Sequence, residues 1–128
     1  MFYLDTSAAA KLVISERGST ALRRWVSVRD DLLFSSDLLR TELLRATRRG
    51  APEQMVQARA VLESLILLTL STVVCERAAL LEPEGLRSLD ALHLAAALEV
   101  GDDLQGLLTY DRQLAEGAAA LGIEVISP

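Results

Sequence analysis

Short apolar runs of strand length alternate with longer amphipathic segments along this chain, and this alternation constrains the fold more than any other feature. The strand-length runs lie at residues 2–5, 32–34, 66–70, 107–110 and 123–126. Helical patterns lie between them, at residues 6–14, 19–28, 37–49, 53–64, 72–81, 88–99 and 111–121. Such alternation is typical of βαβ units, so the sequence predicts an α/β fold with a mainly parallel sheet.

Breaks between these segments carry ordinary turn and cap chemistry. Gly50 and Pro52 end the third helical pattern, residues 82–85 form a turn, and Ser88 is expected to cap the helix that follows. We find no repeat or linker, and 128 residues fit one domain, so residues 1–128 are expected to form a single domain that holds all of the chemistry.

Cysteine content and hydropathy favour a cytoplasmic protein. The chain has one cysteine, Cys75, and its N-terminus lacks the basic and apolar segments of a signal peptide. Its most apolar stretch, residues 65–74, is far shorter than the roughly 20 residues that span a bilayer, so no membrane role is expected. The net charge of −5 opposes a nucleic-acid partner, although the basic residues are almost all arginines, which bind phosphate well.

Three aspartates lie where the carboxyl ends of parallel strands meet. Asp5 ends the first strand, Asp111 follows the fourth, and Asp90 lies in the first turn of the helix that begins near Ser88. Ligands of open α/β sheets collect at this edge. Each aspartate also has an ordinary explanation as a helix cap or first-turn residue, which is worth about 0.3 to 2 kcal/mol.

Two carboxylates lie on apolar helix stripes, which is unusual for a charged side chain. Glu42 shares a stripe with Leu39 and Leu43, and Asp90 shares one with His93 and Leu94. A buried carboxylate needs an arginine, a proton or a metal. The strand-end and helix-face acids together predict one acidic pocket, and a divalent cation is the simplest relief of its repulsion.

An all-oxygen set of ligands favours Mg²⁺ or Mn²⁺ over zinc, for which the chain offers only His93 and Cys75. Mg²⁺ bound by a few carboxylates and a substrate phosphate is the usual arrangement for phosphodiester hydrolysis. A paired-histidine mechanism lacks its second histidine, and a cysteine nucleophile lacks a partner. We therefore expect His93 to be a packed helix residue.

Four segments, in this order and spacing, resemble the PIN-domain family, and in particular the VapC toxins of type II toxin–antitoxin pairs. They are Phe2-Tyr3-Leu4-Asp5-Thr6-Ser7-Ala8; Thr41-Glu42-Leu43 with Ala46 and Arg49; Leu89-Asp90-Ala91-Leu92-His93-Leu94-Ala95-Ala96-Ala97; and Leu107-Leu108-Thr109-Tyr110-Asp111 with Leu114. The resemblance spans essentially the whole chain. It implies a three-layer α/β/α fold with four to five strands, and Mg²⁺- or Mn²⁺-dependent endoribonuclease activity that leaves 5′-phosphate and 3′-hydroxyl ends.

The resemblance also implies roles for the acids. Asp5 and Asp90 would be the principal metal ligands, Glu42 would complete the pocket, and Asp111 would act directly or through a water. Asp37 and Asp103 are alternatives for the fourth acid. Supporting hydroxyls would come from Thr6 or Ser7 and from Thr109.

Its implied partners are RNA, a VapB-type antitoxin and a second copy of the chain. An antitoxin would dock in an apolar groove, which residues 13–25 and 39–59 could line as readily as they could form core. Phosphate contacts would come from rim arginines, of which Arg112, Arg40 and Arg45 are nearest to the acids in sequence.

Two other functions remain open. A phosphoacceptor or phosphatase domain also places an aspartate after its first strand, but those folds need a second acid beside it, and here Thr6 and Ser7 follow Asp5. In a non-catalytic interaction module, the aspartates would be helix caps and Glu42 would pair with an arginine.

Overall fold

The computed structural model describes residues 1–128 and contains one five-stranded sheet in the order β3-β2-β1-β4-β5, with every neighbouring pair parallel. The strands are β1 (Phe2–Leu4), β2 (Leu33–Ser36), β3 (Ile66–Leu68), β4 (Gly106–Leu108) and β5 (Val125–Ile126). The helices are α1 (Thr6–Val13), α2 (Ser19–Ser27), α3 (Asp37–Gly50), α4 (Met55–Ser64), α5 (Thr72–Leu80), α6 (Ser88–Leu98) and α7 (Arg112–Ala120), with short 3₁₀ turns at Pro52–Gln54 and Gly101–Asp103. The predicted parallel α/β fold is confirmed.

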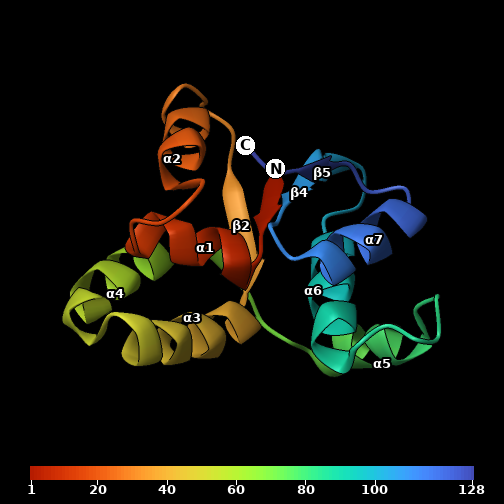
Figure 1. Cartoon of the computed structure of the whole chain (residues 1–128). Coiled ribbons are helices and arrows are strands. Elements are labelled where there is room, and N and C mark those ends of the chain that lie inside the picture. The colour runs from red at the N-terminus through yellow and green to blue at the C-terminus, as the bar shows by residue number, and fades with distance from the viewer.

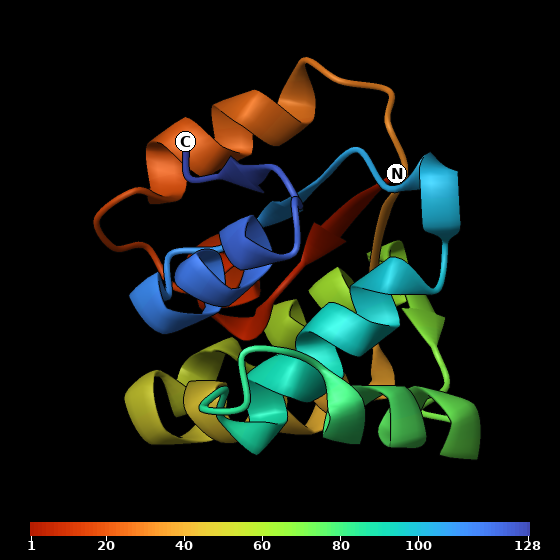
Figure 2. The same ribbon diagram turned by 90° about the vertical axis from the view of Figure 1, so that its right-hand side faces the viewer.

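Helices cover both faces of the sheet, in three layers. Figure 1 shows α1 to α4 on one side of the strands and α5 to α7 on the other, and Figure 2 shows α6 running between α5 and α7. Alternate residues of β1 supply the two cores, because successive strand side chains point to opposite faces. Phe2 and Leu4 pack with α1 to α4, whereas Tyr3 packs with α6 and α7.

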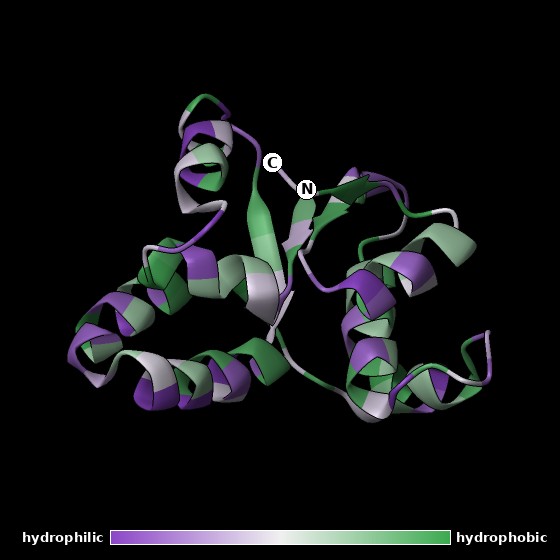
Figure 3. Cartoon of the chain, in the orientation of Figure 1, coloured by the Kyte–Doolittle hydropathy of each residue, from purple (hydrophilic) through white to green (hydrophobic).

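The strands are hydrophobic along most of their length, as the colouring of Figure 3 shows. Tyr3, Leu4, Phe34, Leu107 and Leu108 are fully buried. A central parallel strand covered by helices on both faces is expected to have this composition. No helix of this structure combines the length and the apolar character that a membrane crossing requires.

Several element boundaries differ from the sequence prediction. Strand β2 extends through Ser35 and Ser36, two residues beyond the predicted run at residues 32–34. Ser35 Oγ donates a hydrogen bond of 2.7 Å to the Leu4 carbonyl, which satisfies a buried hydroxyl within the sheet. Ser36 does cap α3, by accepting from the Leu38 amide. The expectation that Ser88 caps α6 is wrong, because Arg87 occupies the cap position and no side chain caps the helix.

Candidate active site

The four predicted acids line one pocket of about 280 Å³ at the carboxyl edge of the sheet. Asp5 follows β1, Asp111 follows β4, and Glu42 and Asp90 reach the pocket from α3 and α6. The edge arises from parallel strands that all end in the same direction. A larger hollow of about 660 Å³ lies beside α5 and α6, but its lining is mainly apolar and includes none of these acids.

Asp5 is almost fully buried, with 3% of its surface exposed, and has no basic partner. It caps α1 by accepting from the Ala8 amide at 2.9 Å. Ser7 Oγ donates to the same carboxylate at 2.8 Å, and Thr109 Oγ1 donates at 2.6 Å. Burial nevertheless outweighs these hydrogen bonds and raises the pKa of Asp5 above its usual value. Asp5 is therefore both the cap of helix α1 and a member of the acidic pocket.

The Glu42 carboxylate is held in place by two side chains, the hydroxyl of Thr6 and the imidazole of His93. Thr6 Oγ1 donates to Glu42 Oε1 at 2.8 Å, and His93 Nε2 lies 2.7 Å from the same oxygen. Burial raises the pKa of Glu42, but the hydrogen bond and charge of His93, with the bond from Thr6, outweigh it and lower the pKa overall. His93 is packed in its helix, as expected, and it also lines the acidic pocket. Sequence periodicity predicted the packing of His93 but not its place in the pocket beside Glu42.

Asp90 and Asp111 share one guanidinium. Arg87 Nε donates to Asp90 Oδ2 at 2.5 Å, and Arg87 Nη2 lies 3.0 Å from both carboxylate oxygens of Asp111. Asp111 also caps α7 by accepting from the Leu114 amide at 3.0 Å. Burial raises the pKa of Asp111, but the Leu114 amide and Arg87 outweigh it and hold the pKa below its usual value. The sequence predicted a divalent cation as the simplest relief of the repulsion among these acids. In the structure, Arg87 and His93 already provide part of that relief.

The donor chemistry of the pocket fits a hard divalent cation, although the side chains as placed do not surround a common point. No three of the histidine, cysteine, aspartate and glutamate side chains form a ready metal cluster. Glu42 Oε2 and Asp90 Oδ1 accept no hydrogen bond within the protein, while the partner oxygen of each carboxylate is held. Mg²⁺ keeps several waters and is often held by only one or two carboxylates. These two oxygens, and the Asp5 carboxylate, which forms no ion pair with a basic side chain, are therefore suitable ligands.

Some of the other candidates lie away from the pocket. Asp37 is partly exposed at the start of α3 and pairs with Arg40 at 3.8 Å, and Asp103 is exposed in a turn before β4, at the opposite edge of the sheet. Neither lines the pocket, whereas the hydroxyl-bearing Thr6 and Ser7 do. Thr109 is fully buried and reaches the pocket through its hydrogen bond to Asp5.

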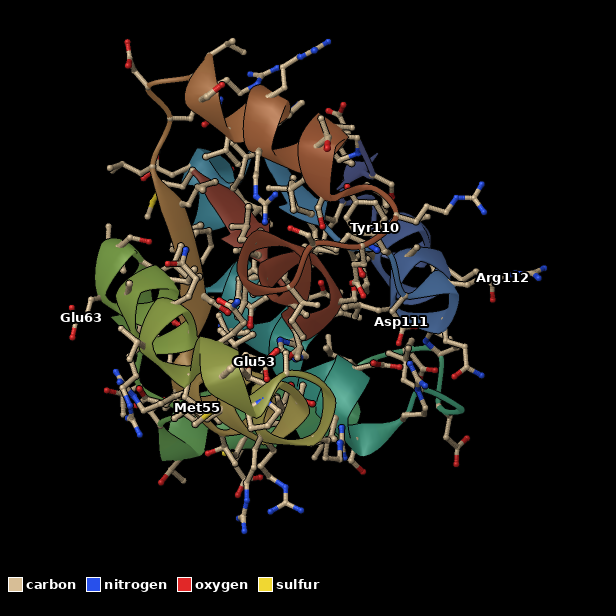
Figure 4. All side chains as sticks on the ribbon, turned by 60° about the vertical axis from the view of Figure 1, so that its left-hand side comes forward. Glu53, Met55, Glu63, Tyr110, Asp111 and Arg112 are labelled. Atoms are coloured by element: carbon tan, nitrogen blue, oxygen red, sulfur yellow. The ribbon has the colours of Figure 1, made fainter.

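The predicted rim arginines are also absent from the pocket lining. Arg112 extends away from the protein (Figure 4), with 92% of its side chain exposed, and pairs with Glu116. Arg40 and Arg45 do not line the pocket either. The arginine that does is Arg87, three residues before Asp90. That spacing is the one signal in the sequence that could have identified it, since residues three apart become neighbours in a first helical turn.

Comparisons with known proteins agree with this geometry. A family model described as the PIN domain matches residues 2–120. The chain is 41% identical to Ribonuclease VapC47 of Mycobacterium tuberculosis, covering 100% of this chain and 97% of that protein, and 40% identical to Ribonuclease VapC35 of the same species with the same coverage.

Two solved structures share the fold at low sequence identity. The crystal structure of Mycobacterium tuberculosis VapC20, described as a Sarcin-Ricin loop cleaving toxin, has a TM-score of 0.80 and 18% identity, and the match covers both chains completely. A chain of a toxin–antitoxin complex from Klebsiella pneumoniae has a TM-score of 0.77 and 20% identity, with 100% of this chain and 98% of that chain covered. These two matches support the three-layer fold.

Proposed function

The chain belongs to the PIN-domain family, within its VapC group, and on that premise we propose that it is a divalent-metal-dependent endoribonuclease, the toxin of a type II toxin–antitoxin pair, that uses Mg²⁺ or Mn²⁺. The observation that carries the proposal is the meeting of Asp5, Glu42, Asp90 and Asp111 in one pocket from four separate segments. The curated relatives named as ribonucleases match along the whole chain, which supports the same activity here.

The proposed roles follow from the contacts in the pocket. A divalent cation bound there would supply a Lewis acid that favours attack of water on phosphorus and neutralises the developing charge. Asp5, Glu42, Asp90 and Asp111 would hold it. Ser7 and Thr109 fix the Asp5 carboxylate through their hydroxyls. Water as the nucleophile accords with products that carry 5′-phosphate and 3′-hydroxyl ends.

Histidine chemistry is a poor alternative in this pocket. Both ring nitrogens of His93 are engaged, Nε2 with Glu42 at 2.7 Å and Nδ1 with the Tyr3 hydroxyl at 2.8 Å. The His93 side chain is also only 5% exposed, so it has little access to a substrate. We therefore assign His93 a role in holding Glu42 and assign the ribonuclease chemistry to the carboxylates.

Cleavage of RNA by the purified protein tests the proposal. RNA would be incubated with wild type, Asp5→Asn and Asp90→Asn in the presence of Mg²⁺, Mn²⁺ or EDTA. Asp37→Asn is a matched control, because Asp37 is an acid at the same edge of the sheet that lies outside the pocket. We expect cleavage with either metal, none in EDTA, and a loss of more than about 100-fold in the two pocket variants but not in the control.

Cleavage that persists in both pocket variants, with the fold intact by circular dichroism, would overturn the metal-nuclease proposal. No cleavage by wild type under any metal condition would favour the non-catalytic module, in which Asp5 and Asp111 act only as caps. Sequencing the 5′ ends of the fragments after controlled expression would identify the target RNA and the cleaved position.

An antitoxin partner, a homodimer and a cytoplasmic location complete the proposal. The Klebsiella pneumoniae neighbour comes from a toxin–antitoxin complex, which supports an antitoxin for this chain. The free and exposed Cys75 suits a reducing compartment. Coexpression with the product of an adjacent gene for a small DNA-binding protein, followed by copurification and light scattering, would test both kinds of assembly.

A further inference from the structure

Arg87 is the single lysine or arginine in the lining of the acidic pocket. The other lining residues are the four acids, three hydroxyl-bearing residues, His93 and two leucines. The same arginine and Asp90 also line a neighbouring hollow of about 210 Å³ between the turn at residues 83–87 and α7. Arg87 therefore lies at the boundary of two adjoining depressions, where an extended substrate could pass the acids.

Its contacts orient the guanidinium and leave one edge unused. Arg87 Nε donates to Asp90, and Arg87 Nη2 donates to Asp111. Arg87 Nη1 makes no hydrogen bond in the protein, and 50% of the Arg87 side chain is exposed. A guanidinium is planar and carries five N–H donors, so two carboxylates that fix its plane also fix the direction of the free Nη1 donors.

A free cationic donor at this position would offset the negative charge of the molecule. The chain carries a net charge of −5, and its candidate active site gathers four carboxylates, so RNA phosphates are repelled from the position where they would react. Arg112 cannot offset this repulsion locally, because it points away from the protein (Figure 4). Arginine is well suited to the task, since its fork matches the oxygens of a phosphate.

We propose that Arg87 is a substrate-binding residue that receives an RNA phosphate through Nη1 at the mouth of the acidic pocket. The inference rests on the proposed function, because it names the residue that would bring RNA to the carboxylates. Asp90 and Asp111 then have a second role, which is to orient this guanidinium.

RNA binding without cleavage tests the inference. A short single-stranded RNA of mixed sequence, labelled with fluorescein, would be titrated with Asp5→Asn, Asp5→Asn/Arg87→Gln, Asp5→Asn/Arg87→Lys and Asp5→Asn/Arg112→Gln in Mg²⁺, with fluorescence anisotropy as the readout. Arg112→Gln is the matched control, because it removes the same charge from a side chain that points into solvent. Circular dichroism melts would check that each variant folds.

We expect Arg87→Gln to weaken RNA binding by roughly tenfold or more, as the loss of one charge-assisted contact would. The slope of log Kd against log salt concentration should decrease by about 0.7, the value for one phosphate contact with a single strand. Arg87→Lys should retain part of the affinity, since it keeps the charge but not the fork. Arg112→Gln should leave affinity within about twofold.

Equal RNA affinity of the Arg87→Gln and Arg112→Gln variants would overturn the inference. So would tighter Mn²⁺ binding by Arg87→Gln in a chain that keeps Asp5, with RNA affinity unchanged in the Asp5→Asn background, because Arg87 would then be only a counter-ion of the acids. Because Arg87→Lys keeps the charge but has no Nη1, full affinity in that variant would overturn the assignment of the phosphate contact to Nη1. Cleavage of the RNA by Asp5→Asn itself would instead contradict the proposed function.

Discussion

His93 Nε2 lies 2.7 Å from Glu42 Oε1, and this contact connects helix α6 to helix α3 at the carboxyl edge of the sheet. The other ring nitrogen, Nδ1, lies 2.8 Å from the hydroxyl of the buried Tyr3 on β1. A strand and two helices therefore hold one carboxylate in place. This linkage ties the geometry of the acidic pocket to the packing of the core.

His93→Leu should reduce cleavage by about 10- to 100-fold, which is the usual effect of losing a group that orients a metal-binding carboxylate. The leucine fills the space but removes the His93 contact, which leaves Thr6 as the one side chain that donates to Glu42. His93→Gln, which keeps a donor, should recover part of the loss. The measurement is kcat/KM on a fluorogenic RNA, together with the affinity for Mn²⁺. Equal activity of the leucine and glutamine variants would show that Glu42 does not depend on the hydrogen bond.

Acid should weaken the fold partly through Glu42. Burial raises its pKa, but His93 and Thr6 outweigh burial and lower the pKa below the usual 4.5. A carboxyl whose pKa is lower in the folded state contributes stability above its unfolded pKa and loses it as pH falls through the folded value. The free energy of unfolding of wild type should therefore decline below about pH 4.5 more steeply than that of Glu42→Gln.

Urea denaturation at a series of pH values measures this difference, and Glu63→Gln, an exposed glutamate on α4, is the control. The control should follow the wild-type profile. Parallel profiles for wild type and Glu42→Gln would contradict the assignment of a lowered pKa to Glu42.

Asp5→Asn should stabilise the metal-free protein at pH 7 while it abolishes cleavage. Burial raises the pKa of Asp5, so the folded state binds a proton more readily than the unfolded state does. Stability then falls as pH rises from the unfolded pKa to the folded one, and the ionised carboxylate remains a cost at neutral pH. Asparagine removes this cost and can still accept from the Ala8 amide.

Thermal melts in EDTA measure the effect, and melts with added Mg²⁺ provide a second comparison. A ligand that binds only the folded state raises its stability, so Mg²⁺ should raise the Tm of wild type and not that of Asp5→Asn. A lower Tm for Asp5→Asn than for wild type in EDTA would show that the hydrogen bonds to Asp5 outweigh its burial.

Much of the fold and the acid set could be predicted from local patterns. Asp5 and Asp111 follow strands, and parallel strands end at one edge, so their meeting required only the correct order of elements. Glu42 and Asp90 were found because each interrupts an apolar helix stripe. The structure confirms the parallel α/β architecture and brings these four residues to one pocket, while their catalytic roles remain a prediction.

The cations of the pocket could not be predicted in the same way. Arg87 follows an irregular turn at residues 82–86, where no periodicity fixes the direction of a side chain. Arg112 was predicted to bind phosphate because it follows Asp111 in the sequence. Its side chain points away from the pocket instead. The contact of His93 with Glu42 depends on the packing of two helices that lie far apart in sequence.

Thr109→Val should destabilise the protein and slow cleavage, because one buried hydroxyl connects two of the acids. Thr109 Oγ1 donates to Asp5 Oδ2 at 2.6 Å and accepts from the Asp111 amide at 3.0 Å. Valine has the same shape but leaves both groups without this partner, at a cost of about 1–3 kcal/mol in the free energy of unfolding. Loss of the donor also raises the pKa of Asp5 further, which disfavours the charged form that a cation would bind.

Thr109→Ser separates the hydroxyl from the methyl group of Thr109. Serine keeps the donor and acceptor, so its loss of stability should reflect only the missing methyl, about 1 kcal/mol, and its cleavage rate should stay near wild type. Urea denaturation and single-turnover cleavage would be measured on both variants. If valine proves as stable and as active as serine, the Thr109 hydroxyl does not hold Asp5 in the form that cleavage needs, and Ser7 and the Ala8 amide must be sufficient to hold it.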